Sequence, residues 1–206
     1  MHIDAILTGP VARFGPRGEA SAIVKTAVES AVSVGLLGLK GDAQADLSVH
    51  GGPDKAIHHY PREHYGWWAE RIAHPSLAAP GAFGENISTH GLTEEDVCIG
   101  DRFRLGSALV EVAQGRQPCW KQAHRLGDTS VVGLMVKTGR SGWYYRVIEP
   151  GRVAAGEALN LVERQHPGWS VARTTALIVA GVGRDADSVR ALRAVTALAQ
   201  AWVKRL

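Results

Sequence analysis

At Gln114-Gly115-Arg116-Gln117-Pro118-Cys119-Trp120-Lys121, a predicted strand leads into a predicted short helix. The β-branched pattern of residues 109–113 indicates the strand. A helix over residues 120–126 would end at Gly127. Further short strands are predicted at residues 2–7, 22–24, 31–34, 55–60 and 143–148. With 24 glycines and 9 prolines between such runs, the sequence predicts a mainly β protein, a barrel of short strands with a few short helices.

Cys119 would lie in the first turn of that helix, after Gln117 at the cap and Pro118 at the first position, where a missing N–H has no cost. The free backbone N–H groups, the helix dipole and the neighbouring Arg116 and Lys121 all favour a thiolate. A thiolate attacks electrophiles or binds a soft metal. A lone cysteine is most often a small buried hydrophobic residue, so both interpretations stay open.

The composition is that of an ordinary soluble globular protein. Its 206 residues, 45% hydrophobic and 21% charged, suffice for one core and a small extra module. The net charge of +3 is slight and no run of Lys and Arg stands out, which argues against a nucleic-acid partner. No apolar stretch approaches 18 residues and Asp4 does not fit a signal peptide, so we expect no membrane partner and a cytoplasmic location. The second cysteine, Cys98, has an apolar context typical of an inert core thiol, and no disulfide is expected.

Histidines gather between His50 and His64, where four of the nine lie. His58 and His59 are adjacent in a predicted strand, so only one of them can face a given pocket. A zinc site would favour a pattern such as His-Glu-x-x-His, which the sequence lacks. Histidine suits the role of proton donor near neutral pH, and Lys55 suits that of an anchor for an anionic ligand.

Three polar residues further along the chain could also contact a ligand. Asn86 offers a donor and an acceptor that suit the edge of a pterin or purine ring, although Asn is equally a routine turn residue. Arg140 and Ser141 could hold a phosphate through charge and hydroxyl, although a solvated loop arginine is the alternative. A helix predicted over residues 61–72 places Trp68 on its core-facing side, so core packing is favoured over ring stacking.

The end of the chain has the pattern of a small three-helix module. Its boundary lies near Gln165-His166-Pro167-Gly168, which divides residues 1–164 from residues 165–206. Helix starts are predicted at Ser170, for a helix over residues 171–180, at Asp187 or Ser188, and at Thr196. About 40 residues cannot build a self-sufficient core, so the module should dock on the barrel.

Five ordered blocks of the chain resemble the MOSC domain, which is named from the C-terminal part of molybdenum cofactor sulfurases. The blocks are Gly38-Leu39-Lys40-Gly41-Asp42-Ala43-Gln44-Ala45-Asp46, His50-Gly51-Gly52-Pro53-Asp54-Lys55-Ala56, Gly81-Ala82-Phe83-Gly84-Glu85-Asn86-Ile87, Ile99-Gly100-Asp101 and Arg116-Gln117-Pro118-Cys119. The tail from His166-Pro167-Gly168-Trp169 onward resembles the appendix of the stand-alone bacterial YiiM type, so the resemblance covers nearly the whole chain. The family usually has Pro-Arg ahead of Pro-Cys, and Gly115 here replaces that first proline, which leaves the rigidity of the loop open.

The resemblance implies a MOSC-type β-barrel with core motifs within residues 36–162, followed by the three-helix module. It also implies a molybdenum cofactor, molybdopterin with molybdenum, whose metal Cys119 ligates. The candidate site residues are catalytic Cys119, His50 and His59, and cofactor-binding Arg116, Gln117, Lys55, Asn86, Arg140 and Ser141. The implied activity is the reduction of N-hydroxylated compounds such as hydroxylaminopurines, with electrons from a separate flavoprotein.

Two other functions fit the same cysteine. Cys119 could carry a persulfide and hand its sulfur to a cofactor or a metal cluster, although the chain has no pyridoxal-phosphate domain to supply it. The protein could instead be a non-enzymatic module that binds or stores molybdopterin, with the helical tail as an interaction surface.

Overall fold

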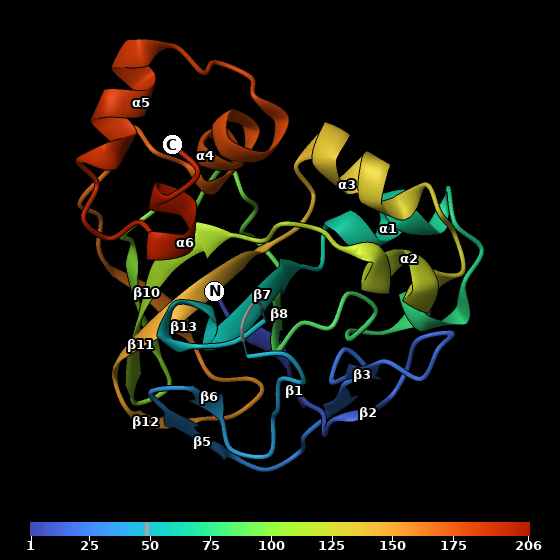
Figure 1. Ribbon diagram of the computed structural model, residues 1–206. Coiled ribbons are helices and arrows are strands. Elements are labelled where there is room, and N and C mark those ends of the chain that lie inside the picture. The colour runs from blue at the N-terminus through green and yellow to red at the C-terminus, as the bar shows by residue number, and fades with distance from the viewer. Residues whose placement is uncertain (48–49) are drawn as a thin grey trace.

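A curled eight-stranded sheet forms the body of the computed structural model, which describes residues 1–47 and 50–206 (Figure 1). In spatial order the strands are β13 (Leu159–Glu163), β9 (Arg102–Leu105), β10 (Ala108–Gly115), β11 (Trp143–Glu149), β7 (Ile57–Pro61), β8 (Ile87–Thr89), β1 (Ile3–Thr8) and β4 (Thr26–Ala27). Neighbouring strands are antiparallel except β7 and β8, which are parallel. The expectation of a mainly β, barrel-like fold is confirmed.

The curl of the sheet brings the start of β1 back to β13. His2 forms an isolated antiparallel bridge with Ala158, and the Leu159 N–H donates to the Met1 carbonyl at 3.0 Å. Because β4 pairs only with the end of β1, the start of β1 has a free side, and this contact with the edge strand β13 pairs backbone groups that would otherwise need water.

Two small sheets cover one end of the curled sheet. They consist of β12 (Gly151–Val153), β5 (Val32–Gly35) and β6 (Gly38–Leu39), and of β2 (Ala12–Arg13) and β3 (Ala20–Ser21). The strand expected over residues 22–24 is absent, because Ala22 and Ile23 bury their side chains without joining a ladder. Apolar character at this position reflects burial alone.

Helices α1 (His64–Ala69), α2 (Trp120–Leu126) and α3 (Val131–Thr138) group together beside the sheet (Figure 1). The short helices η1 (Pro53–Lys55) and η2 (Pro75–Ala78) lie in the connections. Trp68 is fully buried in a cluster with Tyr60, Phe83 and Met135, so its expected role in packing is confirmed. This cluster forms the outer wall of the region between the end of β10 and the start of α2.

The tail forms α4 (Val171–Thr175), which continues as the π-helical turn η3 (Ala176–Ala180), then α5 (Ala186–Arg193) and α6 (Gln200–Val203). The Ser170 hydroxyl accepts from the Arg173 N–H at 3.1 Å, as an N-cap should. The second helix starts slightly earlier than expected because Asp185 caps it, and the third starts at Gln200 instead of Thr196. None of the helices in the described ranges is long and apolar enough to cross a membrane.

The tail has no separate core, as its length predicts. Val112 of β10 belongs to the same hydrophobic cluster as Val171, Leu177 and Trp202 of the tail. The Ala199 N–H also donates to the Ala113 carbonyl of β10 at 2.9 Å. The division at residues 164 and 165 stays a prediction, whereas the docking of the helices on the sheet is a property of the structure.

Gly115 is the place where the tail packs most closely on β10. A Cβ at Gly115 would clash with Thr175 Oγ1 and would lie 2.9 Å from a ring carbon of Trp202. A larger residue, the family's proline included, would push α4 and α6 away from the strand. The packing of α4 and α6 on β10 therefore requires glycine at this position. Contacts with the tail hold the loop that follows.

Candidate functional site

Cys119 is the N-cap residue of α2, with an extended backbone (φ −137°, ψ 171°). Its N–H donates to the Gln122 side-chain carbonyl at 2.8 Å, and the helix spans Trp120–Leu126, the range that the sequence predicts. The cap is Cys119 instead of Gln117, so Cys119 precedes the first turn of the helix and does not lie in it. The result is a free, half-buried thiol at the mouth of the strand-to-helix junction.

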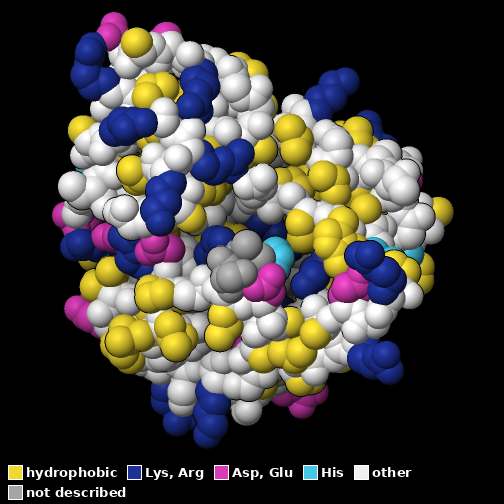
Figure 2. Space-filling model, in the orientation of Figure 1, with side chains coloured by type: hydrophobic (Ala, Val, Ile, Leu, Met, Phe, Trp, Pro, Cys, Tyr) yellow, Lys and Arg dark blue, Asp and Glu magenta, His cyan; other side chains and the backbone are white. Residues whose placement is uncertain are grey.

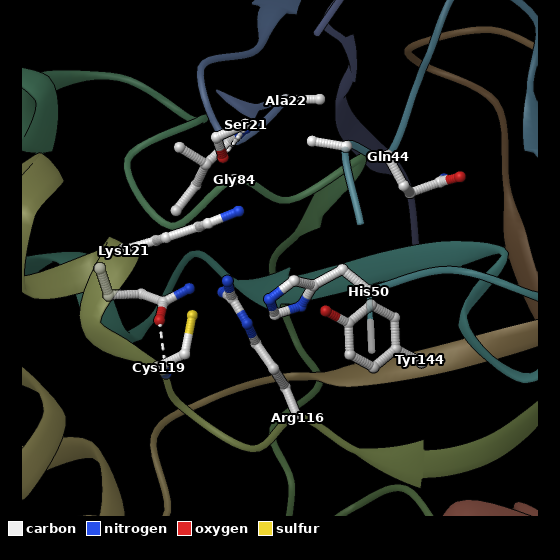
Figure 3. Close-up of a pocket in the computed structure, with 12 residues that line it drawn as sticks. Ser21, Ala22, Gln44, His50, Gly84, Arg116, Cys119, Lys121 and Tyr144 are labelled. Carbon is white, nitrogen blue, oxygen red and sulfur yellow. Dashed lines mark hydrogen bonds between the residues drawn. The ribbon is translucent and has the colours of Figure 1, made fainter. Parts of the chain in front are cut away.

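A first cavity opens on one side of this thiol, with about 460 Å³ of space that is partly open to solvent. Figure 3 shows the Arg116 guanidinium, the His50 ring and the Cys119 thiol pointing toward this space, with Lys121 across from them. The described lining residues include no Asp or Glu. The electrostatic field at the thiol is therefore set by cations.

A second cavity of about 930 Å³, also partly open to solvent, lies on the other side of the thiol. It shares His50, Cys119 and Tyr144 with the first cavity. Its remaining wall comes from Lys55, Gln114, Gln117, Pro118, Ala201, Trp202 and Arg205. Figure 2 shows the hollow at the centre of this face, with Lys and Arg side chains around it. Cys119 thus stands at the junction of two cavities.

Arg116 is nearly buried, with 7% of its surface exposed. Its Nη1 donates to the Phe83 carbonyl at 2.6 Å, which fixes the direction of the guanidinium. Behind it, Lys25 forms a buried ion pair with Asp42. Burial lowers the pKa of Lys25, Asp42 opposes this effect, and the nearby charge of Arg116 adds to the lowering. Asp42 thus balances Lys25, and Arg116 is the cation that lines the first cavity at this point.

His50 is half-buried at the entrance to both cavities. Burial lowers its pKa below the usual value of 6.5, and the charges of Lys121, Arg116 and Lys55 lower it further. His50 is therefore neutral at pH 7. The neutral ring has no extra proton to donate, so His50 could act only as a proton relay, which accepts one proton as it gives up another.

The structure places His59 in the core of the sheet instead of the pocket, which corrects the sequence-based assignment. Its Nδ1 lies 3.0 Å from the Tyr145 hydroxyl and its Nε2 lies 2.8 Å from Thr89 Oγ1. Burial lowers its pKa to about 3. The alternation along β7 turns His58 to the other side, where its ring centre is 5.0 Å from that of Tyr144.

Asn86 is also outside both cavities. Its side chain accepts from the His58 N–H at 3.0 Å and donates to Asp42 at 2.8 Å and to the Leu7 carbonyl at 3.1 Å. These bonds join β1, β7 and the start of β8 beneath the cavity floor. Asn86 therefore positions the strands, and its polar atoms have partners in the protein already.

Arg140 and Ser141 are not brought to Cys119 either. The Arg140 guanidinium carbon lies 4.7 Å from the centre of the Trp67 ring, a cation–π geometry. Ser141 is 1% exposed, and its N–H donates to the Glu94 carboxylate at 3.0 Å. Neither residue lines the cavities beside the thiol.

Two buried side-chain amides that line the cavities each have one polar atom without a hydrogen-bond partner within the described structure. They are Gln122, through Nε2, in the first cavity and Gln114, through Oε1, in the second. A buried polar atom left unpaired costs about 1–3 kcal/mol. Polar ligand atoms in these cavities would remove that cost.

The site also contains residues that the sequence did not single out as ligand contacts, namely Lys121, Tyr144, Trp202 and Arg205. Within the described part of the chain, no three His, Cys, Asp or Glu side chains are grouped as a metal site. A metal at Cys119 would thus have at most one further ligand of these types among the described residues.

Comparison with known proteins adds independent information. Residues 46–160 match the model of the MOSC domain family. The chain is 41% identical over 202 residues to Protein YiiM of Escherichia coli K12, covering 98% of this chain and 89% of that protein. It is 40% identical over 153 residues to a protein named Reductase from Gibberella moniliformis, covering 73% of this chain and 27% of that protein. The crystal structure of YiiM from Geobacillus stearothermophilus is similar with a TM-score of 0.83 and 35% identity, covering 98% of this chain and 95% of that one.

Proposed function

The chain belongs to the MOSC domain family, and from this premise we propose that it is a molybdenum cofactor-dependent reductase of N-hydroxylated compounds. The observation that carries the proposal is the half-buried Cys119 thiol between two cavities whose described walls contain cations and no carboxylate. A thiolate suits a metal whose other ligands are sulfur and oxo groups. The cations suit an anionic cofactor.

The first cavity has the groups that such a cofactor requires. Cys119 would ligate the metal, and Arg116 and Lys121 would hold the terminal phosphate of molybdopterin. The unpaired Gln122 Nε2 would donate to an acceptor of the pterin. When bound, the cofactor would supply two-electron redox chemistry at its metal.

The reaction consumes two electrons and two protons: R–NH–OH gives R–NH₂ and water as the N–O bond breaks. His50 and Tyr144 lie where both cavities meet the thiol, so they can reach a substrate there. Burial raises the pKa of Tyr144, which keeps its hydroxyl protonated at neutral pH. Tyr144 would donate a hydrogen bond to the departing oxygen, and neutral His50 would relay a proton from solvent.

The electrons would come from a separate flavoprotein reductase. The fungal relative named Reductase is much longer than the matched region, since the match covers 27% of it. We propose that the remainder of such a protein supplies the electron-transfer unit, a task that a separate partner performs for the present chain.

Metal and pterin analysis of freshly purified protein, followed by a reductase assay with a flavoprotein donor, tests the proposal. We expect about one molybdenum and one pterin per chain, and reduction of a hydroxylaminopurine that depends on both. Cofactor without reduction would support a storage module. A persulfide on Cys119 without molybdenum would support a sulfur carrier.

A further inference from the structure

The second cavity has one wall from the barrel and the other from the C-terminal helices. Lys55 comes from η1, next to β7, whereas Trp202 and Arg205 come from α6 and the residues after it. Figure 1 shows α6 beside the end of β10, where the strand leads toward α2. Both walls are held together by the Ala199 N–H, which donates to the Ala113 carbonyl at 2.9 Å, and by the Gln200 N–H, which donates to Asp54 at 3.3 Å.

We propose that this cavity is the substrate pocket and that it selects an aromatic N-hydroxylated compound carrying a phosphate, of the nucleoside monophosphate class, with Arg205 binding the phosphate. The inference rests on the proposed function, in which the cofactor occupies the first cavity. A molecule in the second cavity would then reach the metal ligand Cys119 directly, because the two cavities share that residue.

Charge is the first argument for a phosphate. Lys55 and Arg205 line the cavity, and its described wall has no Asp or Glu. The tail adds to this field, because residues 165–206 contain six Lys and Arg against two Asp and Glu, a net charge of +4, while the whole chain has +3. A phosphate group carries close to two negative charges at neutral pH, which two cations can balance.

Geometry supports Arg205 as the contact that recognises the phosphate. Its side chain is exposed, so it keeps donors available, and one of them is fixed by a hydrogen bond to the Gln117 side chain, two residues before Cys119. A second donor reaches the Ile178 carbonyl at 3.4 Å. A guanidinium held in this way presents its remaining N–H groups in a defined direction, which suits phosphate oxygens.

The rest of the wall suits an aromatic ring. Three residues with aromatic rings, Tyr144, His50 and Trp202, line the cavity, and the unpaired Gln114 Oε1 can accept from an exocyclic amine. A volume of about 930 Å³, part of it open to solvent, is within the range of small-molecule pockets and leaves room for a base, a sugar and a phosphate.

The test measures binding to the full chain by calorimetry, with adenosine 5′-monophosphate, adenosine and inorganic phosphate as probes. We expect the monophosphate to bind at least about tenfold more tightly than either of the others. Arg205→Gln should weaken binding of the monophosphate roughly ten- to hundredfold and leave adenosine unchanged, as expected for the loss of a charge-assisted hydrogen bond. Arg205→Lys, which keeps the charge, should recover part of the loss.

Arg190→Gln is the matched control, since Arg190 is an exposed arginine of the same module that pairs with Asp187 and is not in the cavity wall. It should leave all three affinities unchanged. Equal affinity for monophosphate and adenosine, equal affinity for monophosphate and inorganic phosphate, or equal effects of the two Gln variants would overturn the inference. So would a lack of monophosphate binding to both cofactor-loaded and cofactor-free protein.

These outcomes are distinct from failure of the proposed function. Protein without molybdenum that still prefers the monophosphate through Arg205 would overturn the reductase and support the binding site. A loaded enzyme that reduces an N-hydroxylated purine and its monophosphate with the same kcat/KM, in wild type and in Arg205→Gln, would overturn the binding site and support the reductase.

Discussion

The two cysteines of this chain lie in opposite surroundings. Cys98 is 3% exposed, and its Sγ lies 3.6 Å from the Pro167 carbonyl. Burial raises the pKa of its thiol, and the carboxylate of Asp101 raises it further. Cys119 is half-buried at the junction of two cavities, with Arg116 and Lys121 in the lining. The backbone thus surrounds one sulfur with apolar groups and a carboxylate, and the other with space and cations.

The difference shows that the role of a thiol depends on what the fold brings to it from elsewhere. Val97 and Ile99 keep Cys98 inside the core, where deprotonation is unfavourable. The extended backbone at Cys119 and the start of α2 hold the second thiol at an opening. A ligand can therefore reach only one of the two sulfurs without local unfolding.

Exchange of each cysteine for alanine gives the largest contrast. Cys119→Ala should abolish reductase activity and remove molybdenum from the purified protein, with the melting temperature nearly unchanged. Cys98→Ala should retain both metal and activity and lose about 1 kcal/mol of stability, since it removes a small buried side chain. Metal analysis, turnover and thermal melts of the two variants measure this. Equal loss of activity in both would remove the distinction between the two regions.

Charge reversal at Arg116 tests the cations around Cys119. Arg116→Glu should leave molybdenum occupancy below about a tenth of wild type, and Arg116→Gln should weaken cofactor binding by about 1.5–3 kcal/mol, typical of a charge-assisted hydrogen bond. The measurement is the molybdenum content of the variants, compared at the same amount of titratable free thiol. Arg193→Glu, on the exposed surface of α5, is the control and should keep full occupancy. Normal occupancy in a folded Arg116→Glu protein would mean that other cations hold the cofactor.

Alkylation of cofactor-free protein sharpens the comparison without any catalytic assay. We expect iodoacetamide at pH 7.5 to modify Cys119 at least about tenfold faster than Cys98, because Cys98 is buried and its raised pKa keeps it protonated. Peptide mass spectrometry resolves the two sites. In denaturant the two rates should become similar. A Cys98 rate that matches Cys119 in the native protein would contradict the structural assignment of the core thiol.

The histidines show a similar contrast, since His50 lies at the entrance to the cavities and His59 lies in the core of the sheet. The smallest predicted effect is the contribution of His59 to the pH dependence of stability. The folded pKa of His59 is about 3, below the unfolded value near 6.5, so the unfolded chain binds the proton first as the pH falls. As the pH falls from about 6 to about 4, protonation of His59 in the unfolded chain should therefore reduce the free energy of unfolding by about 1.4 kcal/mol per pH unit. Denaturant melts of wild type and His59→Gln measure the slope, which should be shallower in the variant. Identical slopes would show that His59 does not contribute to it.

Substitution of His50 tests the residue at the entrance to the two cavities. His50→Ala should lower kcat about tenfold or more with molybdenum content nearly unchanged, because in the proposed function the neutral ring would relay protons and would not ligate the metal. Turnover and metal analysis on the same preparation separate the two effects. If the variant loses metal as completely as Cys119→Ala, His50 is a ligand and the role assigned to it is wrong.

Sequence reasoning was accurate where the determinants are local. The strand before Cys119, the end of α2 at Gly127 and the Ser170 cap are all fixed by neighbouring residues, and the structure confirms them. The choice between His58 and His59 was not local. It depends on the register in which His59 faces Trp143 and His58 faces Tyr144, and alternation alone does not reveal which side of the strand meets the cavity.

The sequence predicted Lys55 and Gln117 in the second cavity but not Tyr144, Trp202 or Arg205. These residues come from widely separated segments, and only the curl of the sheet and the docking of α6 bring them together. Asn86 shows the reverse case. A residue with the chemistry of a ligand contact is engaged by Leu7 and Asp42, both more than 40 positions away, so its polarity serves the fold.

The division of the second cavity between the middle and the last residues of the chain also matters while the protein is being made. The wall with Trp202 and Arg205 does not exist until the ribosome has added 86 residues after Cys119. At a synthesis rate of 5–20 residues per second, this interval lasts roughly 4–17 s. During that time the thiol leaves the ribosome without half of its enclosure. The second cavity can therefore enclose a ligand only after residues 202 and 205 have been made and α6 has docked on β10, whereas the described wall of the first cavity contains no residue of the tail.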